Sequence, residues 1–159
     1  MLSRRLTLLL VLLLSSCGFH LQSALTTPAE MERTYLAAEN THSQFYRELR
    51  SQLRAAGVIL VESPAEATAT LSILVDETDQ RVLSVSARNV PTEYEVYYSV
   101  EYELLSGETS LLAPQMLTLT RDYTYNENLV LGKAREEAMM REAIVSDLVR
   151  IVLKQISSL

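Results

Sequence analysis

Cys17 is the single cysteine of the chain, and the residues before it form the pattern of a lipid-attachment signal. The chain begins with the basic pair Arg4 and Arg5, continues with an apolar run over residues 6–14, and reaches Cys17 through small serines. This order is typical of a bacterial lipoprotein signal peptide over residues 1–16. We expect cleavage before Cys17, an S-diacylglycerol group on its sulfur, an N-acyl chain on its new amino terminus, and no other cofactor.

The apolar run is too short for a transmembrane helix. It has nine residues, whereas about 20 are needed to cross a bilayer. A buried core helix would account for the run but not for the cysteine at its end. Two or more acyl chains give stable anchoring. Aspartate after the cysteine is typical of lipoproteins kept at the inner membrane, so Gly18 predicts the periplasmic side of the outer membrane.

Composition narrows the class of protein further. Removing residues 1–16 takes away Arg4 and Arg5 and no acid, which leaves 12 basic and 20 acidic residues and moves the net charge from −6 to −8. This acidic balance argues against a nucleic-acid partner. With Cys17 lipidated no disulfide can form, so the fold depends on core packing or on a partner. Residues 17–30 lack periodicity and predict a tether, and residues 31–159 predict one domain.

Two segments have helical periodicity. The first predicted helix follows Thr41 and Gln44, which have the spacing of a capping box with Thr41 as the N-cap. Gly57 is placed just past the end of this helix. The second extends over residues 128–156. The apolar stripes are Phe45, Leu49, Leu53 and Ala56 in the first helix, and Met140, Ile144, Leu148 and Ile151 in the second.

Strand-like alternation occupies most of the remaining chain. It is clearest over residues 93–104, and occurs also at 31–38, at 68–76 with a weak continuation over 82–85, and at 116–125. The short apolar run 58–61 could form a strand directly after the first helix. The sequence therefore predicts an α+β fold in the order β-α-β-β-β-α. We expect a two-layer sandwich with one mostly antiparallel or mixed sheet of about four strands and two helices on one face.

Residue types that carry catalysis or hold metals are not arranged for either purpose. His20 and His42 have no cysteine, nucleophilic serine or carboxylate pair beside them, and no glycine-rich phosphate loop occurs. We therefore expect no enzyme activity and no metal. The acidic residues Glu93, Glu95, Glu101 and Glu103 alternate along one strand, which predicts a solvated sheet face. Tyr97 shares that face and is a candidate for an interface, where tyrosine is enriched.

Four segments together resemble the family of LPS-assembly lipoproteins called LptE, formerly rare lipoprotein B. The resemblance covers nearly the whole chain. It rests on Cys17-Gly18-Phe19-His20-Leu21, on residues 47–58 with the sequence RELRSQLRAAGV, on Glu93-Tyr94-Glu95-Val96, and on Arg121-Asp122-Tyr123 leading into the last helix.

This resemblance implies a lipid-anchored outer-membrane subunit that forms a 1:1 complex with the β-barrel LptD. Within the barrel lumen it would act as a plug, assist barrel assembly, and help deliver lipopolysaccharide to the cell surface. The alternative is a stand-alone outer-membrane lipoprotein that binds a lipid in the periplasm, which predicts a closed apolar cavity. A third possibility, an envelope hydrolase, has no supporting set of residues.

The resemblance also implies lipopolysaccharide contacts at two basic positions, Arg88 and Lys133. Arg88 precedes the long strand and matches the family pattern with a one-residue gap, and Lys133 precedes the body of the last helix. Lipid A carries phosphates, which arginine can bind with two parallel hydrogen bonds and lysine can bind as a point charge. The alternative for each residue is an ordinary solvated surface charge.

Overall fold

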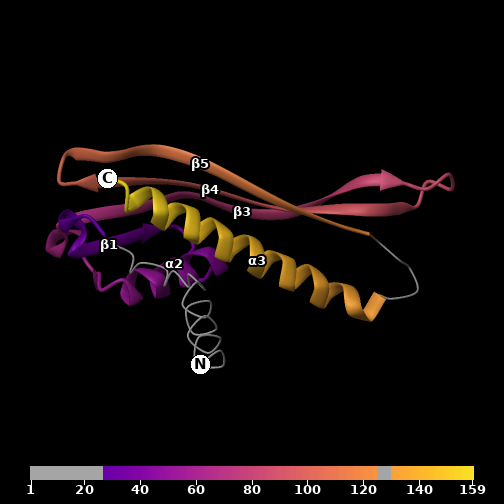
Figure 1. Cartoon of the computed structure of the whole chain (residues 1–159), viewed down its shortest axis with the longest axis horizontal. Coiled ribbons are helices and arrows are strands. Elements are labelled where there is room, and N and C mark those ends of the chain that lie inside the picture. The colour runs from indigo at the N-terminus through magenta and orange to yellow at the C-terminus, as the bar shows by residue number, and fades with distance from the viewer. Residues whose placement is uncertain (1–26, 125–129) are drawn as a thin grey trace, which may run out of the picture.

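The computed structural model describes residues 27–124 and 130–159, with the side chains of residues 130–134 excepted. Its centre is a five-stranded sheet with the strand order β2-β1-β3-β4-β5 (Figure 1). The strand β1 pairs in parallel with β2 and with β3, and the remaining pairs are antiparallel. The strands are β1 (Arg33–Ala38), β2 (Ile59–Val61), β3 (Ala69–Val85), β4 (Pro91–Ser106) and β5 (Thr109–Thr124).

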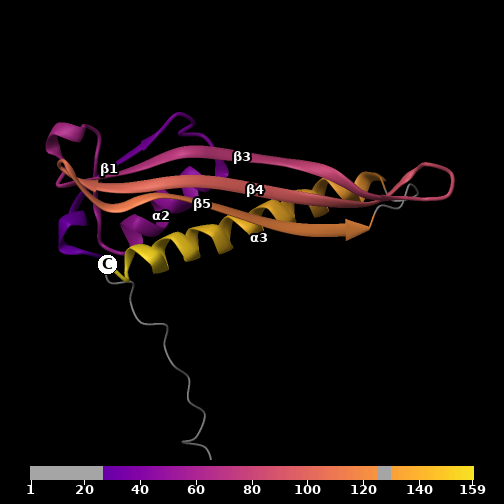
Figure 2. The same ribbon diagram turned by 90° about the horizontal axis from the view of Figure 1, so that it is seen from above.

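The helices α2 (Gln44–Ala55) and α3 (Val130–Ile156) cover the same face of this sheet (Figures 1 and 2). Two short 3₁₀ turns, η1 (Ala29–Met31) and η2 (Pro64–Glu66), precede β1 and β3. The predicted two-layer α+β sandwich with a mixed sheet is confirmed. Within the part of the chain that the structure describes, no helix is both long and apolar enough to span a bilayer.

The sheet has five strands, so the prediction of about four is one too low. The additional strand is β2, which the apolar run after the first helix forms by pairing Arg33 with Ile59 and Tyr35 with Val61. The strand β3 is also longer than predicted, because the segments 68–76 and 82–85 join into one strand of 17 residues. The last strand begins at Thr109, upstream of the predicted residue 116.

The predicted N-cap Thr41 is wrong, because Ser43 caps α2. Ser43 has an extended backbone, and its hydroxyl accepts a hydrogen bond from the backbone N–H of Tyr46 at 3.0 Å. This bond satisfies one of the donors that a helix leaves unpaired in its first turn. The end of the helix is as predicted, since Gly57 takes a φ of 89°, a backbone conformation that suits glycine.

The hydrophobic core lies between the two helices and one half of the sheet. Along β4 the predicted inward face is buried from Val96 to Leu104, and Tyr94 at its distal end is partly buried. The buried residues that meet across the layers are Phe45, Leu49 and Leu53 of α2, Val96, Tyr98, Val100, Tyr102 and Leu104 of β4, and Ile144, Leu148, Val152 and Ile156 of α3.

Hydrogen bonds from buried and half-buried hydroxyl groups join the helices to the sheet. The Tyr98 hydroxyl donates to Asp76 Oδ1 at 2.6 Å, and the Ser43 hydroxyl donates to the other oxygen of the same carboxylate. Asp76 therefore joins the start of α2 to β3 and β4. On the second helix, the Tyr102 hydroxyl donates to Gln155 Oε1 at 2.5 Å. The hydroxyls of the two buried tyrosines are thus both paired, which avoids the cost of an unsatisfied buried polar group.

The buried tyrosines predict a loss of stability at alkaline pH. Burial raises the pKa of Tyr102 to about 12, and burial together with the Asp76 carboxylate raises the pKa of Tyr98 well above its usual value. An unfolded chain ionises its tyrosines near about pH 10. The unfolded state therefore releases protons first as pH rises, and the free energy of unfolding falls between about pH 10 and pH 12.

Urea unfolding at a series of pH values measures this fall. We expect Tyr102→Phe to lose about 1 kcal/mol at neutral pH with its hydrogen bond, but to show a shallower decline above about pH 10. The control Tyr97→Phe removes a hydroxyl outside the core and should leave the decline unchanged. An unfolding free energy that stays constant up to about pH 12 would contradict the assignment.

Candidate functional site

Arg88 lies in the turn that joins β3 to β4, at the far end of a long hairpin (Figures 1 and 2). The turn is closed by hydrogen bonds from Ser86 N–H to the Val90 carbonyl and from Asn89 N–H to the Ser86 carbonyl, both at 2.8 Å. Asn89 has a φ of 62°, a left-handed conformation that asparagine tolerates better than most residues. The side chain of Arg88 is exposed on this hydrogen-bonded turn.

The surroundings of Arg88 leave its charge available to an external anion. Residues 86–90 contain no acid, and no salt bridge among the described residues includes Arg88. Arg81, on the same hairpin, differs in this respect. Its guanidinium pairs with the Glu95 carboxylate and lies 5.9 Å from the centre of the Tyr97 ring. Arg81 is therefore held on the sheet surface, whereas Arg88 is not.

The second predicted basic residue, Lys133, falls within the first turns of α3, and its side chain lies outside the described residues. The start of α3 and the hairpin turn lie at the same end of the molecule, although the hairpin projects further (Figure 2). The fold thus brings the backbone positions of Arg88 and Lys133 to one end.

Cys17 also lies outside the described residues, but the point from which its segment enters the domain can be located. The Glu30 carbonyl accepts a hydrogen bond from the Thr68 hydroxyl at 2.5 Å, just before β3 begins. From there β3 extends for 17 residues to the hairpin turn, which at about 3.3 Å per residue is roughly 55 Å. The N-terminal segment and Arg88 therefore join opposite ends of an elongated domain (Figure 1).

The sheet face opposite the helices is mainly polar, as predicted, although the row of Val75, Glu101 and Met116 on it carries two apolar side chains. Three other rows of paired residues cross β3, β4 and β5 on this side, and they carry hydroxyl groups and charges. One cross-strand hydrogen bond joins the Ser99 and Thr118 hydroxyls at 2.8 Å. The rows are Glu77, Ser99 and Thr118; Asp79, Tyr97 and Thr120; and Arg81, Glu95 and Asp122. No described helix covers these rows, so they can meet water or a polar partner.

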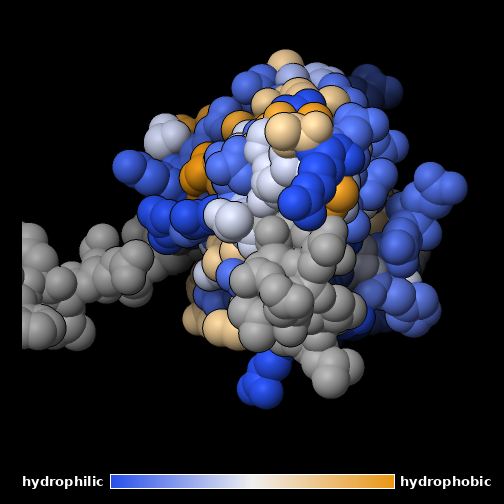
Figure 3. Space-filling view, turned by 90° about the vertical axis from the view of Figure 1, so that its right-hand side faces the viewer, coloured by the Kyte–Doolittle hydropathy of each residue, from blue (hydrophilic) through white to orange (hydrophobic). Residues whose placement is uncertain are grey.

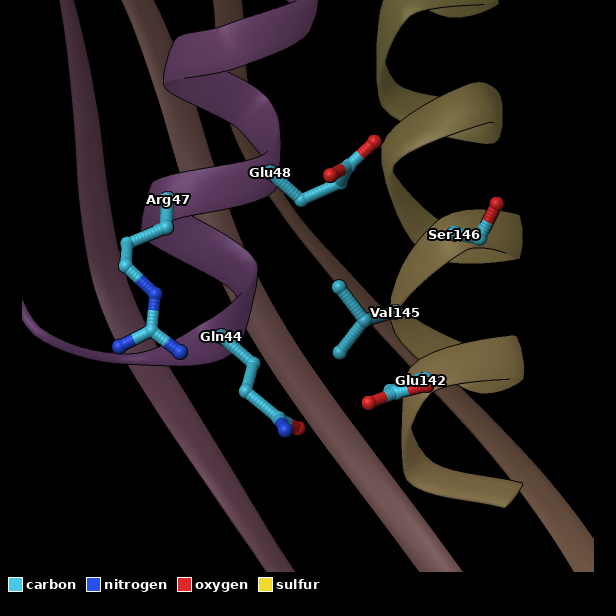
Figure 4. A pocket seen from close by; sticks show the side chains of 6 residues that line it. All are labelled: Gln44, Arg47, Glu48, Glu142, Val145 and Ser146. Carbon is cyan, nitrogen blue, oxygen red and sulfur yellow. The ribbon is translucent and has the colours of Figure 1, made fainter. Parts of the chain in front are cut away.

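A groove between α2 and α3 was not predicted from the sequence (Figure 4). Its volume is about 470 Å³. A smaller cavity of about 130 Å³ lies where α2 meets β1 and β2. Neither is the closed apolar cavity that a stand-alone lipid-binding protein requires. The groove has one apolar lining residue, Val145, and the smaller cavity, although partly apolar, is well below the several hundred Å³ typical of a ligand pocket. The lining of the groove is Gln44, Arg47, Glu48, Glu142, Val145 and Ser146.

Metal ligands are not grouped in the described part of the chain, where no three histidine, cysteine, aspartate or glutamate side chains are placed to hold one ion. Three surfaces are candidate binding sites: the hairpin end, the polar sheet face, and the end from which the N-terminal segment leaves. All three suit binding to a partner or a lipid.

Comparison with protein families gives a match over the whole domain. The model described as LptE, lipopolysaccharide-assembly, matches residues 31–156. A relative from Pectobacterium atrosepticum, named LPS-assembly lipoprotein LptE, is 27% identical over 151 residues, which are 91% of this chain and 81% of the relative. A protein of the same name from Yersinia enterocolitica is 25% identical over 135 residues, 84% of this chain and 65% of that relative, slightly under two thirds of its length.

Solved structures share the fold. The solution structure of lipoprotein B from Nitrosomonas europaea has a TM-score of 0.74 and 26% identity, and the match covers 89% of this chain and 91% of that one. The crystal structure of rare lipoprotein B from Shewanella oneidensis has a TM-score of 0.68, 23% identity, and coverage of 79% and 94%. The second likeness concerns the fold alone.

Proposed function

The chain belongs to the LptE family of lipopolysaccharide-assembly proteins, and on this premise we propose that it is an outer-membrane lipoprotein that plugs an LptD-type β-barrel and helps deliver lipopolysaccharide to the cell surface. The observation that carries the proposal is the family match over residues 31–156, which includes all five strands and both α-helices that the structure describes. The proposal assigns no catalysed reaction to the chain.

The surface of the domain supports placement inside a barrel. The lumen of a large outer-membrane barrel is polar, and the uncovered sheet face carries hydroxyl groups and charges in three cross-strand rows. The groove between the helices is also polar. A domain with these surfaces can line a hydrated lumen without exposing a large apolar face, and a permanent 1:1 partner would compensate for the absence of disulfides.

The length of the domain supports a role across the membrane. In the proposal residues 1–16 are removed, Cys17 is lipidated in the inner leaflet, and residues 17–30 act as the tether. The strand β3 alone has 17 residues, roughly 55 Å, and a bilayer with its headgroups is about 40–45 Å thick. A domain held near the periplasmic leaflet at one end is therefore long enough to place its hairpin at the outer leaflet.

The basic residues at the distal end provide the lipid contact in this proposal. Arg88 is exposed, has no acid within its turn, and stands out in a chain of net charge −6. A guanidinium can bind the phosphates of lipid A with charge-assisted hydrogen bonds. Lys133 joins it because its backbone lies at the same end of the molecule.

Co-purification from outer membranes tests the proposed partner. We expect the affinity-tagged full chain to recover an LptD-type barrel in a 1:1 ratio. A Cys17→Ser variant, exported with a cleavable signal peptide, should still recover the barrel, because contacts in the lumen rather than the lipid hold the complex. Recovery of the membrane-anchored chain without any barrel protein would refute the proposal.

Charge reversal tests the proposed lipid contact separately. We expect Arg88→Glu combined with Lys133→Glu to weaken lipopolysaccharide binding about tenfold or more, since charge-assisted hydrogen bonds are lost and repulsion replaces them. The barrel complex should still assemble. The matched control is Arg54→Glu with Lys154→Glu, which makes the same change of charge at exposed positions away from the hairpin. If the Arg88→Glu, Lys133→Glu variant binds lipopolysaccharide as the unmodified chain does, both residues are ordinary surface charges.

A further inference from the structure

The end of the β3–β4 hairpin carries three large exposed apolar side chains within four consecutive residues. Val82, Leu83 and Val85 are 47%, 45% and 52% exposed. Five other large apolar residues among those described reach comparable exposure, and each is isolated along the chain: Ile59, Leu74, Met116, Met139 and Leu159. An isolated exposed apolar residue is ordinary, whereas a group of them at a protruding end indicates a binding surface.

These side chains are exposed because the hairpin extends past the helices and because its register is irregular there. Along β4 the fully buried core starts at Val96, and beyond it the Tyr94–Tyr123 ring pair, in the same cross-strand row as Val82, is the last core contact before the hairpin projects past the helices (Figures 1 and 2). The pairing shifts between Val82 and Ser84 and again between Ser84 and Val85. Such bulges turn side chains out of strict alternation.

The apolar end of the hairpin is nevertheless ordered. The Ser84 hydroxyl is 2.8 Å from the Thr92 hydroxyl and donates to the Glu93 carboxylate at 2.8 Å, which joins the two strands just before the turn. The turn is closed by its own backbone hydrogen bonds. These hydrogen bonds hold the backbone on both sides of the apolar residues, and a preformed backbone lowers the entropy cost of binding.

The charge beside this patch identifies the chemistry of its occupant. Arg88 lies three residues beyond Val85, in a turn without an acid and without a salt bridge to any described residue. Seen from the hairpin side, this end of the molecule carries hydrophobic residues next to strongly hydrophilic ones (Figure 3). An apolar surface next to an available cation is complementary to a phosphorylated lipid, whose acyl chains and phosphate are also neighbours.

We propose that Val82, Leu83 and Val85 contact the acyl chains of the same phosphorylated lipid whose phosphate Arg88 binds. The hairpin end then recognises both parts of an amphiphile. The identity of that lipid as lipopolysaccharide rests on the proposed function, whereas the acyl contact rests on the exposed patch itself. A purely electrostatic site at Arg88 would not need the apolar residues.

Comparison of two probes separates the two contacts. The probes are lipopolysaccharide and chemically deacylated lipopolysaccharide, which keeps the phosphates and sugars, and both are measured with the purified full chain. We expect Leu83→Ser with Val85→Ser to weaken binding of intact lipopolysaccharide by about tenfold, as removal of partly exposed apolar contacts should, and to leave binding of the deacylated probe unchanged. Arg88→Glu should weaken both.

The matched control is Ile59→Ser with Met116→Ser, which removes two apolar side chains of similar exposure from other parts of the sheet. It should bind both probes as the unmodified chain does. If the hairpin double variant binds intact lipopolysaccharide normally while the unmodified chain discriminates between the probes, the acyl contact is refuted and the proposed function stands. If the unmodified chain binds neither probe, both fail. If the Leu83→Ser, Val85→Ser variant still binds lipopolysaccharide but no longer co-purifies with the barrel, the acyl contact is refuted and the apolar residues contact the barrel wall.

Tryptophan fluorescence gives a second measurement, which does not depend on affinity. The chain has no tryptophan, so a single introduced residue supplies the whole signal. Leu83→Trp should shift its fluorescence to shorter wavelength when lipopolysaccharide is added, as its ring leaves water. Met116→Trp, at a similarly exposed position, should not shift. Equal shifts at both positions, or none at position 83, would overturn the proposal.

Discussion

The antiparallel pairing of β3 with β4 is the interaction on which the rest of the structure depends. It runs from Thr70 opposite Leu105 to Val85 opposite Pro91. Because side chains alternate across a strand, this one ladder produces two surfaces at once. One carries Val96, Tyr98 and the core beneath the helices, and the other carries the polar rows that no described helix covers.

The same ladder also separates a packed end from a projecting end. Near the start of β3 the sheet is wide, with β1 and β2 beside it and both helices below. Toward the turn the support is reduced to β5, whose Tyr123 stacks on Tyr94 with ring centres 5.6 Å apart. Two-stranded hairpins alone are marginally stable in water. The third strand and this aromatic pair therefore help to hold a hairpin that extends past the core.

Sequence patterns predicted the helices and strands in which the apolar pattern extends over many residues. The alternation from Tyr94 to Leu104 and the apolar stripes of both helices gave strands and helices that the structure confirms. The strand β2 has three residues, which is too short for a strand-like alternation to show in the sequence. The predicted number of strands therefore does not include it. The choice of Ser43 over Thr41 as the N-cap depends on a tertiary contact, since the Ser43 hydroxyl also bonds to Asp76 in β3. Local spacing contains no information about that partner.

The candidate site was predicted in part for similar reasons. Arg88 was selected by resemblance, but its exposure on a closed turn required the fold. The apolar group at Val82, Leu83 and Val85 was read as a weak continuation of a strand, because bulges that redirect side chains leave no clear sequence pattern. Cys17 and the side chain of Lys133 remain predictions of the sequence.

The central claim is that the hairpin end meets lipopolysaccharide inside a barrel while the opposite end stays near the lipid anchor. Photo-cross-linking in living cells tests it most directly, with a photoreactive amino acid placed at one of two exposed alanines. Ala87 neighbours Arg88 in the hairpin turn, and Ala65 lies in η2 at the other end of β3. The account predicts lipopolysaccharide adducts from position 87 and none from position 65. Equal lipopolysaccharide adducts from both positions, or adducts from position 65 alone, would contradict it.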